Sequence, residues 1–367
     1  MRVSFVLPFP YWTGGVRAVY EYSRRLRVRG HTVQVFFPLV PYRFRIGQGG
    51  WRSARSWVGA CRRNLLHGAH PPRPPVIWDV RMVPRIANPH LPDADAVVAT
   101  AWPTAYSVSR LGASKGARCY LIQHREIDSG WPERVDATYR LGLFHIAGSR
   151  ATAREMSERH GVPIRAVAPS GVDASFWGRA NGASGSQRGV LWSCSPVEHK
   201  GGADGRAALE QVHRARPAVR IRAFGFGRPP RLPAFIEYVE RPGDETLREL
   251  YASSEVFLYS SRSEGFGLPP LEAQAAGCAV VSTRVGDVPE FVQHQVTGLL
   301  VEPRDWMGLA QAVVALLDHP ERRERMARTA AAGAAAHGWE RSTDLMERAI
   351  ECAIATRRAA APIPVMR

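Results

Sequence analysis

Two glutamates flank a glycine turn in the stretch SEGFGLPPLEAQAAG, residues 263 to 277. Glu264 precedes the turn and Glu272 follows it, with Gly265 and Gly267 between them. Glycine lets a backbone approach a bound group closely, and the N–H groups at the start of a helix favour an anion such as phosphate. Each carboxylate can accept hydrogen bonds from hydroxyl groups. The pattern therefore indicates a site for one anionic ligand that carries hydroxyl groups on either side.

Lysine is rare in this chain. Of 49 basic residues only Lys115 and Lys200 are lysine, and the others are arginine. This composition indicates a GC-rich genome, so a position that keeps lysine calls for a specific reason. Lys200 lies in the stretch WSCSPVEHKGG, residues 192 to 202, where it is either a surface lysine at a turn or a functional cation.

The strand and the helix predicted around the glycine turn would place the turn at the edge of a sheet. The strand EVFLYS ends just before Glu264, and a helix is expected from Pro269 and Pro270 to a cap at Gly277. The glycine turn would then lie between the carboxyl end of a strand and a helix N-terminus, whose dipole favours negative charge.

Short β-branched runs alternate with amphipathic stretches along nearly the whole chain. One helix is predicted from a buried stripe of Val16, Val19, Tyr20, Ser23 and Leu26, closed by Gly30. Apolar strands separated by helices predict an α/β protein with parallel sheets that are covered on both faces. The predicted strands are RVSFVLP, TVQVFF, DAVVAT, RCYLIQ, LFHIAGS, IRAVAP, GVLWSC, VRIRAFG, EVFLYS and CAVVST.

The length of 367 residues suits two domains. The small, glycine-rich stretch GRANGASGSQRG has no periodicity and precedes a strand, so it indicates a linker. We predict an N-terminal domain at 1–177, a linker at 178–188, a second domain at 189–345, and a C-terminal helix and tail at 346–367.

Several features favour a cytoplasmic protein. The apolar run after Arg2 is too short for a signal peptide, and no window approaches the ~20 apolar residues of a membrane span. The five cysteines are scattered, which fits a reducing compartment.

The net charge of +16 is concentrated in one part of the chain. From Arg43 to Arg85 there are nine arginines against one acid, Asp79, with three tryptophans and Phe44 among them. Such a segment could meet phosphates, an anionic lipid surface or nucleic acid. A solvated, arginine-rich loop would show the same pattern.

The stretch EGFGLPPLEA resembles the E-x7-E signature of family 4 (group 1) retaining glycosyltransferases of the GT-B fold, and further matches occur in the same order. TGGVRAVYEYSRRLRVRGHTV resembles the family's glycine loop and first helix, and PSGVDASFW resembles its N-G-V-D-x-x-x-F element, with Ser170 in place of Asn. EHKGG resembles the E-K-G loop, VRIRAFGFG the glycine-rich strand end, and TGLLVEPRD the element G-L-L-V-x-P-x-D. The resemblance covers nearly the whole chain, strongly from 160 to 320 and weakly from 38 to 95.

This resemblance implies two facing Rossmann-like domains with a cleft between them. The N-terminal domain would bind the acceptor, and the C-terminal domain would bind a nucleotide diphosphate-sugar. The reaction would move the sugar to a hydroxyl acceptor with retention, without a metal or other cofactor. The departing phosphate oxygen would accept the acceptor's proton.

The resemblance also implies roles for individual residues. Lys200 would meet the diphosphate as a point charge while negative charge grows on it. Glu264 would bind the transferred sugar, and Glu272 would bind the ribose hydroxyls. The family arginine five positions before Lys200 is replaced by Ser195, so its substitute stays open.

Backbone positions complete the expected site. The amides of Phe266, Gly267 and Leu268 would hold the sugar and the diphosphate, and Gly225 lies at the glycine-rich strand end. In the N-terminal domain, Gly14 and Gly15 would approach the diphosphate. His124, in QHREID, matches a family histidine near the donor sugar, although a lone histidine can equally be structural. Glu264, Lys200 and His124 are the expected catalytic residues.

Two other patterns could bind a metal. Asp93 and Asp95 form a D-x-D, but they open a predicted buried strand at a position where the family usually has an acid. His67 and His70 could bind zinc, but no further ligands lie close by in the sequence. No metal site is expected.

The expected partners are a nucleotide diphosphate-sugar donor and an unidentified acceptor that is anionic or lipid-linked. Peripheral contact with the inner membrane face is a further hypothesis, and nucleic acid is not expected. Two alternatives stay open: a basic membrane- or nucleic-acid-binding α/β module without turnover, and a GT-B phosphorylase or epimerase. The sequence indicates neither the sugar and base nor the oligomeric state.

Overall fold

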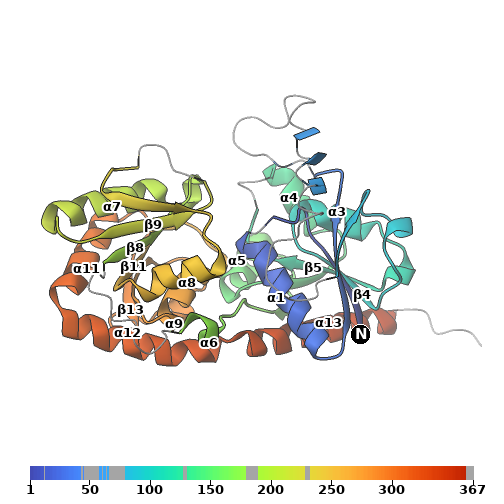
Figure 1. The fold of residues 1–367 in the computed structure, drawn as a ribbon. Helices are drawn as coiled ribbons and strands as arrows, with labels where there is room; N and C mark the ends of the chain where they lie inside the picture. Colours follow the sequence, from blue (N-terminus) through green and yellow to red (C-terminus); the bar gives the residue numbers. More distant parts are fainter. Residues whose placement is uncertain are drawn as a thin grey trace, which may run out of the picture. The chain divides into compact units, whose positions relative to one another are not determined.

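The computed structural model describes residues 1–11, 13–42, 44, 58–59, 61–62, 64–65, 79–126, 130–178, 189–227 and 232–360. The chain forms two compact α/β units (Figure 1). Unit 1 comprises Met1–Ser170 and Ser342–Arg367, and unit 2 comprises Gly171–Arg341.

The units divide before the predicted linker at 178–188, which lies outside the described residues except for Gly178. Trp177 is 1% exposed and packs edge-on against Tyr251, with 5.6 Å between the ring centroids. This apolar contact places residues 171–177 in unit 2, although the prediction assigned them to the N-terminal domain. The predicted C-terminal helix is α13 (Trp339–Ala360), and Ser342 and the residues after it lie in unit 1, where Glu347 pairs with Arg29 at 2.8 Å.

Unit 1 is built on a seven-stranded sheet in the order β3-β2-β1-β4-β5-β6-β7, and each pair of neighbours is parallel. Its strands are β1 (Arg2–Val6), β2 (Thr32–Pro38), β3 (Val80–Val83), β4 (Ala96–Ala99), β5 (Ala117–Ile122), β6 (Phe144–Ala147) and β7 (Ala166–Val167). Besides α13, the helices with described bounds in this unit include α1 (Gly14–Val28), α3 (Trp102–Ser109), α4 (Pro132–Thr138) and α5 (Arg150–His160).

Helix α1 follows the predicted pattern. Thr13 caps its first turn, with Oγ1 accepting a hydrogen bond from the Val16 amide at 3.4 Å. All five residues of the predicted stripe are buried, and Gly30 adopts a φ of +88° just after the helix. The helix stripe predicted from the 3.6-residue period is confirmed.

Unit 2 is built on a six-stranded parallel sheet in the order β10-β9-β8-β11-β12-β13. Its strands are β8 (Val190–Ser193), β9 (Ile221–Gly225), β10 (Ile236–Glu240), β11 (Val256–Tyr259), β12 (Ala279–Thr283) and β13 (Gly298–Val301). The helices are α6 (Ala174–Trp177), α7 (Gly202–Ala215), α8 (Asp244–Ala252), α9 (Leu268–Ala275), α10 (Val288–Phe291), α11 (Trp306–Asp318) and α12 (Pro320–Ala334).

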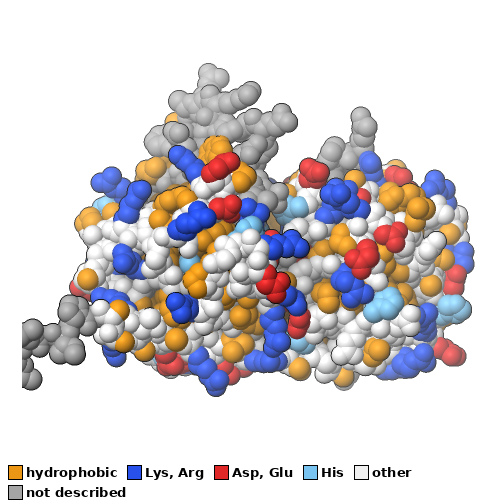
Figure 2. Space-filling model, turned by 180° about the vertical axis from the view of Figure 1, so that it is seen from behind, with side chains coloured by type: hydrophobic (Ala, Val, Ile, Leu, Met, Phe, Trp, Pro, Cys, Tyr) orange, Lys and Arg blue, Asp and Glu red, His pale blue; other side chains and the backbone are white. Residues whose placement is uncertain are grey.

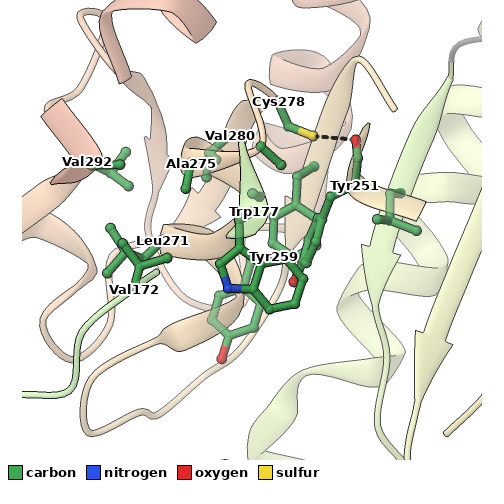
Figure 3. Close-up of a cluster of buried hydrophobic side chains, with 14 of the residues drawn as sticks. Val172, Trp177, Tyr251, Tyr259, Leu271, Ala275, Cys278, Val280 and Val292 are labelled. Atoms are coloured by element: carbon green, nitrogen blue, oxygen red, sulfur yellow. Dashed lines mark hydrogen bonds between the residues drawn. The ribbon is translucent and has the colours of Figure 1, made fainter. Parts of the chain in front are cut away.

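Helices cover both faces of the unit 2 sheet. Side chains of β11 alternate between two cores, because Val256 and Leu258 pack with α7 and α11 while Phe257 and Tyr259 pack with α8 and α9. Figure 3 shows the second core, with Tyr251 and Trp177 close together and the Cys278 thiol at the Tyr251 carbonyl. The predicted α/β class, with parallel sheets covered on both faces, is confirmed.

Strand order defines a switch point in each sheet. Connections run outward in opposite directions from β1 and β4 in unit 1, and from β8 and β11 in unit 2. Ligands of such sheets bind outside the carboxyl ends of the two strands at this point. The loops that follow these four strands are therefore the first place to look for a site.

Basic side chains are spread among acidic and apolar ones on the face of the molecule in Figure 2. Exposed arginines of unit 2 pair with acids, such as Arg216 with Asp318 and Arg220 with Glu237, each at 2.6 Å. None of the described helices combines the length and the apolar character that a membrane span requires.

Candidate functional site

Lys200 and Glu264 meet at the switch point of unit 2. Lys200 ends a short 3-10 helix (Glu198–Lys200) in the loop after β8, and Glu264 lies in the loop after β11. Because these strands are neighbours, their loops bring the Lys200 Nζ to 2.7 Å from Glu264 Oε1. The Lys200 side chain is 35% exposed and that of Glu264 only 9%. A cation at the surface is thus paired with a buried carboxylate.

Glu264 Oε1 accepts two further hydrogen bonds, one from the Tyr259 hydroxyl and one from Ser261 Oγ at 2.9 Å. Burial by itself would raise the pKa of Glu264, but the Lys200 charge and these donors hold that pKa below its ordinary value. Burial, together with the Glu264 charge, raises the pKa of Tyr259 far above its usual range, so its hydroxyl stays a donor. Glu264 is therefore an ionised acceptor at neutral pH.

The loop that carries Lys200 is fixed to the end of β11. Gly201 has a φ of +64°, and a Cβ there would lie 1.8 Å from the Ser260 carbonyl oxygen, so only glycine fits. The Ser260 hydroxyl donates to the Gly201 carbonyl at 3.0 Å. Arg262 forms a bidentate pair with Asp204 of α7, with both hydrogen bonds at 2.7 Å. The Lys200–Glu264 pair therefore rests on a rigid support.

Glu272 lies on the same side of the sheet, as the fifth residue of α9. It is 3% exposed, and its Oε2 accepts a hydrogen bond from the Tyr251 hydroxyl at 3.2 Å. The predicted helix signals are confirmed: α9 begins at Leu268 with prolines in its first turn, and Gly277 has a φ of +74° after its end. Glu272 is thus almost wholly buried in this structure.

The turn before α9 needs its glycine. Gly267 has a φ of +98°, and a Cβ there would lie 2.7 Å from Val288 Cγ2. Phe266 packs against Phe291, with 5.6 Å between the ring centroids. Leu268 opens the helix, so its amide is one of the N–H groups that have no acceptor within the helix. This is the geometry that an anion site at a helix start requires.

Gly225 is the last residue of β9, and a contact within unit 2 makes glycine necessary at this position. A Cβ at this position would lie 1.8 Å from the Cys194 carbonyl oxygen, in the loop after β8. Ser195, at the position of the expected arginine, accepts a hydrogen bond from the Val197 amide at 3.2 Å. Ser195 also lines a pocket of about 580 Å³, together with Arg206 and Arg262. These two arginines are the basic residues that line the pocket together with Ser195.

The other predicted residues lie in unit 1, at the carboxyl edge of its sheet. Gly14 and Gly15 are the first residues of α1, and a Cβ on Gly15 would lie 2.8 Å from the Gln123 side-chain oxygen. His124 follows Gln123 after β5 and is exposed. The structure thus brings the glycine loop close to the residue next to His124.

Glu126 is a unit 1 carboxylate that sequence reasoning missed. Its Oε2 accepts a hydrogen bond from the Trp102 amide, at the start of α3, at 2.6 Å, and one from the Tyr120 hydroxyl at 3.4 Å. Burial raises the pKa of Glu126 to about 8, against the hydrogen bonds that lower it. The sequence analysis also missed the hydroxyl partners of the two glutamates. Tyr259 and Ser261 lie within five residues of Glu264, whereas Tyr251 lies 21 positions before Glu272 and meets it only in the folded chain.

The aspartates of the D-x-D pattern pair with basic side chains in unit 1. Asp93 pairs with Lys115 at 2.9 Å and Asp95 with Arg2 at 3.3 Å. Lys115, the other lysine of the chain, is buried and also donates to the Leu91 carbonyl at 2.8 Å. Among the described residues, no group of three or more His, Cys, Asp or Glu side chains could hold a metal ion. His67 and His70 fall outside that part of the chain.

Comparison with known proteins bears on this site directly. Residues 234–332, which include Glu264, Gly267 and Glu272, match the family model described as glycosyl transferases group 1. This segment of the chain is thus similar to the group 1 glycosyltransferases.

Curated relatives carry a related name. A D-inositol 3-phosphate glycosyltransferase of Segniliparus rotundus is 34% identical over 157 residues, which is 38% of this chain and 34% of the relative. The protein of that name from Streptomyces scabiei is 27% identical over 306 residues, 81% of this chain and 63% of the relative. In both cases the match spans less than two thirds of the relative.

Solved structures share the fold of this chain. Sucrose-phosphate synthase from Thermosynechococcus elongatus aligns over 97% of this chain and all of that one, with a TM-score of 0.70 and 15% identity. Anabaena HepE in complex with UDP-glucose aligns over 98% of this chain and all of that one, with a TM-score of 0.68 and 17% identity. Such low identity shows the fold alone, and the predicted GT-B class is confirmed.

Proposed function

We propose that this protein is a group 1 glycosyltransferase, a retaining, metal-independent enzyme of family 4 that moves a sugar from a nucleotide diphosphate-sugar to a hydroxyl acceptor. The observation that carries the proposal is the meeting of Lys200 and Glu264 at the switch point of unit 2. Nucleotides bind at this place in sheets of this strand order.

A nucleotide-sugar matches the groups around that pair. The partly exposed Lys200 ammonium can meet a diphosphate, and the ionised Glu264 can accept hydrogen bonds from sugar hydroxyls. The start of α9 adds amide donors for phosphate or sugar oxygens. The UDP-glucose complex of the structurally similar HepE supports the same donor class.

In the proposed reaction the bond between the anomeric carbon and the diphosphate oxygen breaks. The acceptor oxygen forms the new bond to that carbon on the same face, and its proton goes to the departing phosphate oxygen. A donor diphosphate would compete with Glu264 for the Lys200 ammonium. Lys200 would then stabilise the negative charge that grows on the leaving group, which makes its contribution largest in the transition state.

A panel of nucleotide-sugars tests this function. A donor that binds should raise the melting temperature by mass action, and it should be turned over slowly to the free nucleotide diphosphate even without an acceptor. The anomeric configuration of a transfer product, read by NMR, decides between retention and inversion. If no nucleotide-sugar stabilises the protein or is consumed, the proposed function is wrong.

For the acceptor, we propose an anionic or lipid-linked molecule bound by unit 1, with peripheral contact to an anionic membrane face. The proposal rests on sequence, because most of the segment from Arg43 to Arg85 lies outside the described residues. Each basic residue near an anionic surface contributes about 1 kcal/mol. Cosedimentation with anionic vesicles should fall with salt, and it should be lost when four arginines between 43 and 63 become glutamine. Equally small pelleting with anionic and neutral vesicles would refute the membrane contact.

A further inference from the structure

Phe226 presents a large apolar ring to solvent at the edge of unit 2 where the donor is proposed to bind. It follows Gly225 at the carboxyl end of β9, the strand next to β8, and is 54% exposed. An aromatic side chain buries a large area when a flat partner stacks on it. Such exposure beside a nucleotide site points to a role in ligand binding.

Contacts with neighbouring segments of unit 2 fix the backbone around Phe226. Gly225 lies against the Cys194 carbonyl, as described above, and its own carbonyl accepts a hydrogen bond from the Arg241 amide at 2.8 Å. The Tyr238 hydroxyl donates to the Gly227 carbonyl at 2.6 Å. Arg241 has a φ of +50°, a strained conformation for a residue with a side chain. The residues that follow β8, β9 and β10 thus lie close together, and their contacts fix the backbone that carries the Phe226 ring.

Phe226 lies just past the end of β9, which ends at Gly225. Two residues earlier, Phe224 belongs to the strand itself. Phe224 packs against Tyr251, with 5.7 Å between the ring centroids, and Tyr251 donates to Glu272. The strand end that Phe226 follows thus lies beside the part of unit 2 in which Tyr251 meets Glu272.

Distance across the sheet suits a nucleotide. Neighbouring strands are about 4.8 Å apart, so the end of β9 lies one strand width from β8, whose loop carries Lys200. A diphosphate at Lys200 would leave its nucleoside free to extend over β9. The end of that strand offers the Gly225–Phe226–Gly227 turn, with an aromatic ring where many dinucleotide-binding sheets have an acid for the ribose.

We propose that Phe226 forms the nucleobase subsite of the donor, with one face of the base stacked on its ring. This inference rests on the proposed function and names the part of the nucleotide that the end of β9 recognises. Stacking tolerates any base because every base has a flat face. Phe226 therefore contributes affinity for nucleoside diphosphates in general, and other groups determine which base is preferred.

Calorimetric titration of the whole protein with UDP and with inorganic pyrophosphate tests the proposal. Loss of base stacking on alanine substitution corresponds to a weakening of about 5- to 150-fold. Phe226→Ala should therefore bind UDP at least about fivefold more weakly and pyrophosphate unchanged. Phe226→Tyr, which keeps the ring, should bind UDP like the wild type. Met307→Ala is the matched control, because Met307 is a 58% exposed side chain on α11 of the same unit.

The outcomes separate this inference from the function on which it rests. If the wild type binds no nucleoside diphosphate, among UDP, GDP and ADP, the proposed function fails. If the wild type binds UDP and Phe226→Ala binds it equally well, the base does not stack on Phe226. Equal weakening of UDP and pyrophosphate would show that the substitution distorts the loop, and this result also overturns the stacking role.

Discussion

Replacing Lys200 by alanine removes the cation that pairs with Glu264, and the structure sets the size of the effect. A hydrogen bond to a charged group contributes about 1.5–3 kcal/mol. Because Lys200 is itself 35% exposed, solvent screening places this pair at the lower end of that range. Tyr259 and Ser261 continue to donate to the carboxylate. We expect the free energy of unfolding of unit 2 to fall by about 1.5 kcal/mol.

A change of that size should lower the melting temperature of a domain with 150–250 residues by roughly 3–6 °C. The effect of Lys200→Ala on stability should depend on pH because of Glu264, whose pKa is lowered in the folded protein. The stabilisation by Glu264 is present above its ordinary pKa of 4.5 and is lost as the pH falls through the lowered value. The penalty of Lys200→Ala should therefore be full at pH 7 and shrink in acid. Turnover at saturating donor should fall by about 100-fold, because the ammonium acts most strongly on the leaving diphosphate.

A double-mutant cycle with Glu264→Gln isolates the pair. In the Glu264→Gln background, Lys200→Ala should cost little stability, so the coupling free energy should be about 1.5 kcal/mol. The matched control is Arg216→Ala, which breaks an exposed pair with Asp318 in the same unit and should cost less than about 1 kcal/mol. Calorimetric melting and donor turnover are the two measurements.

Two results would refute this reasoning. An unchanged melting temperature in Lys200→Ala, or the same loss in both backgrounds, would show that the pair does not stabilise unit 2. A turnover near that of the wild type at saturating donor would remove Lys200 from the reaction, whatever its effect on stability.

Three further predictions follow from the described contacts. Glu272→Gln should mainly weaken nucleotide binding while Glu264→Gln mainly lowers turnover; equal losses of affinity with unchanged kcat in both would contradict the assignment. Excess EDTA should leave the transfer reaction intact. If EDTA abolished activity and Mn²⁺ restored it, Asp93 would again be a candidate metal ligand. The pKa of Glu126 is raised to about 8. Between its ordinary pKa of 4.5 and about 8, the carboxyl therefore ionises in the unfolded chain but stays protonated in the folded protein, which destabilises the fold increasingly as the pH rises. Glu126→Gln should therefore gain stability over the wild type between pH 5 and 8 in denaturant unfolding, whereas Glu133→Gln, on the exposed part of α4, should not.

Local signals were enough to predict much of the fold and part of the site. The stripe of α1 and the ends of α9 depend on neighbours within a few residues, and both are confirmed. Strand prediction missed β3, β10 and β13, and all three lie at the edges of their sheets. Two of them, β3 (VRMV) and β10 (IEYVE), carry charged residues and several side chains that are exposed or half-buried, so they lack the continuous apolar pattern of a buried parallel strand.

Long-range pairing explains what the sequence could not predict. Tyr251 and Glu272 are 21 positions apart, and Lys200 and Glu264 are 64 apart, so their hydrogen bonds exist only once the strand order is set. The unit boundary was misplaced because it was predicted from composition. The glycine-rich stretch marks a change in composition, but the packing of Trp177 against Tyr251 decides that residues 171–177 join the core of unit 2.

The path of the chain through the two units has a consequence for biosynthesis. Unit 2 is one continuous segment, and its two ends lie side by side because Val172 pairs with Gly338. Unit 1 is completed by α13, which supplies Glu347 as the partner of Arg29 and His31. A ribosome therefore releases everything that unit 2 needs before it releases the last helix of unit 1. The unit whose synthesis begins first is thus the one that must wait to finish folding.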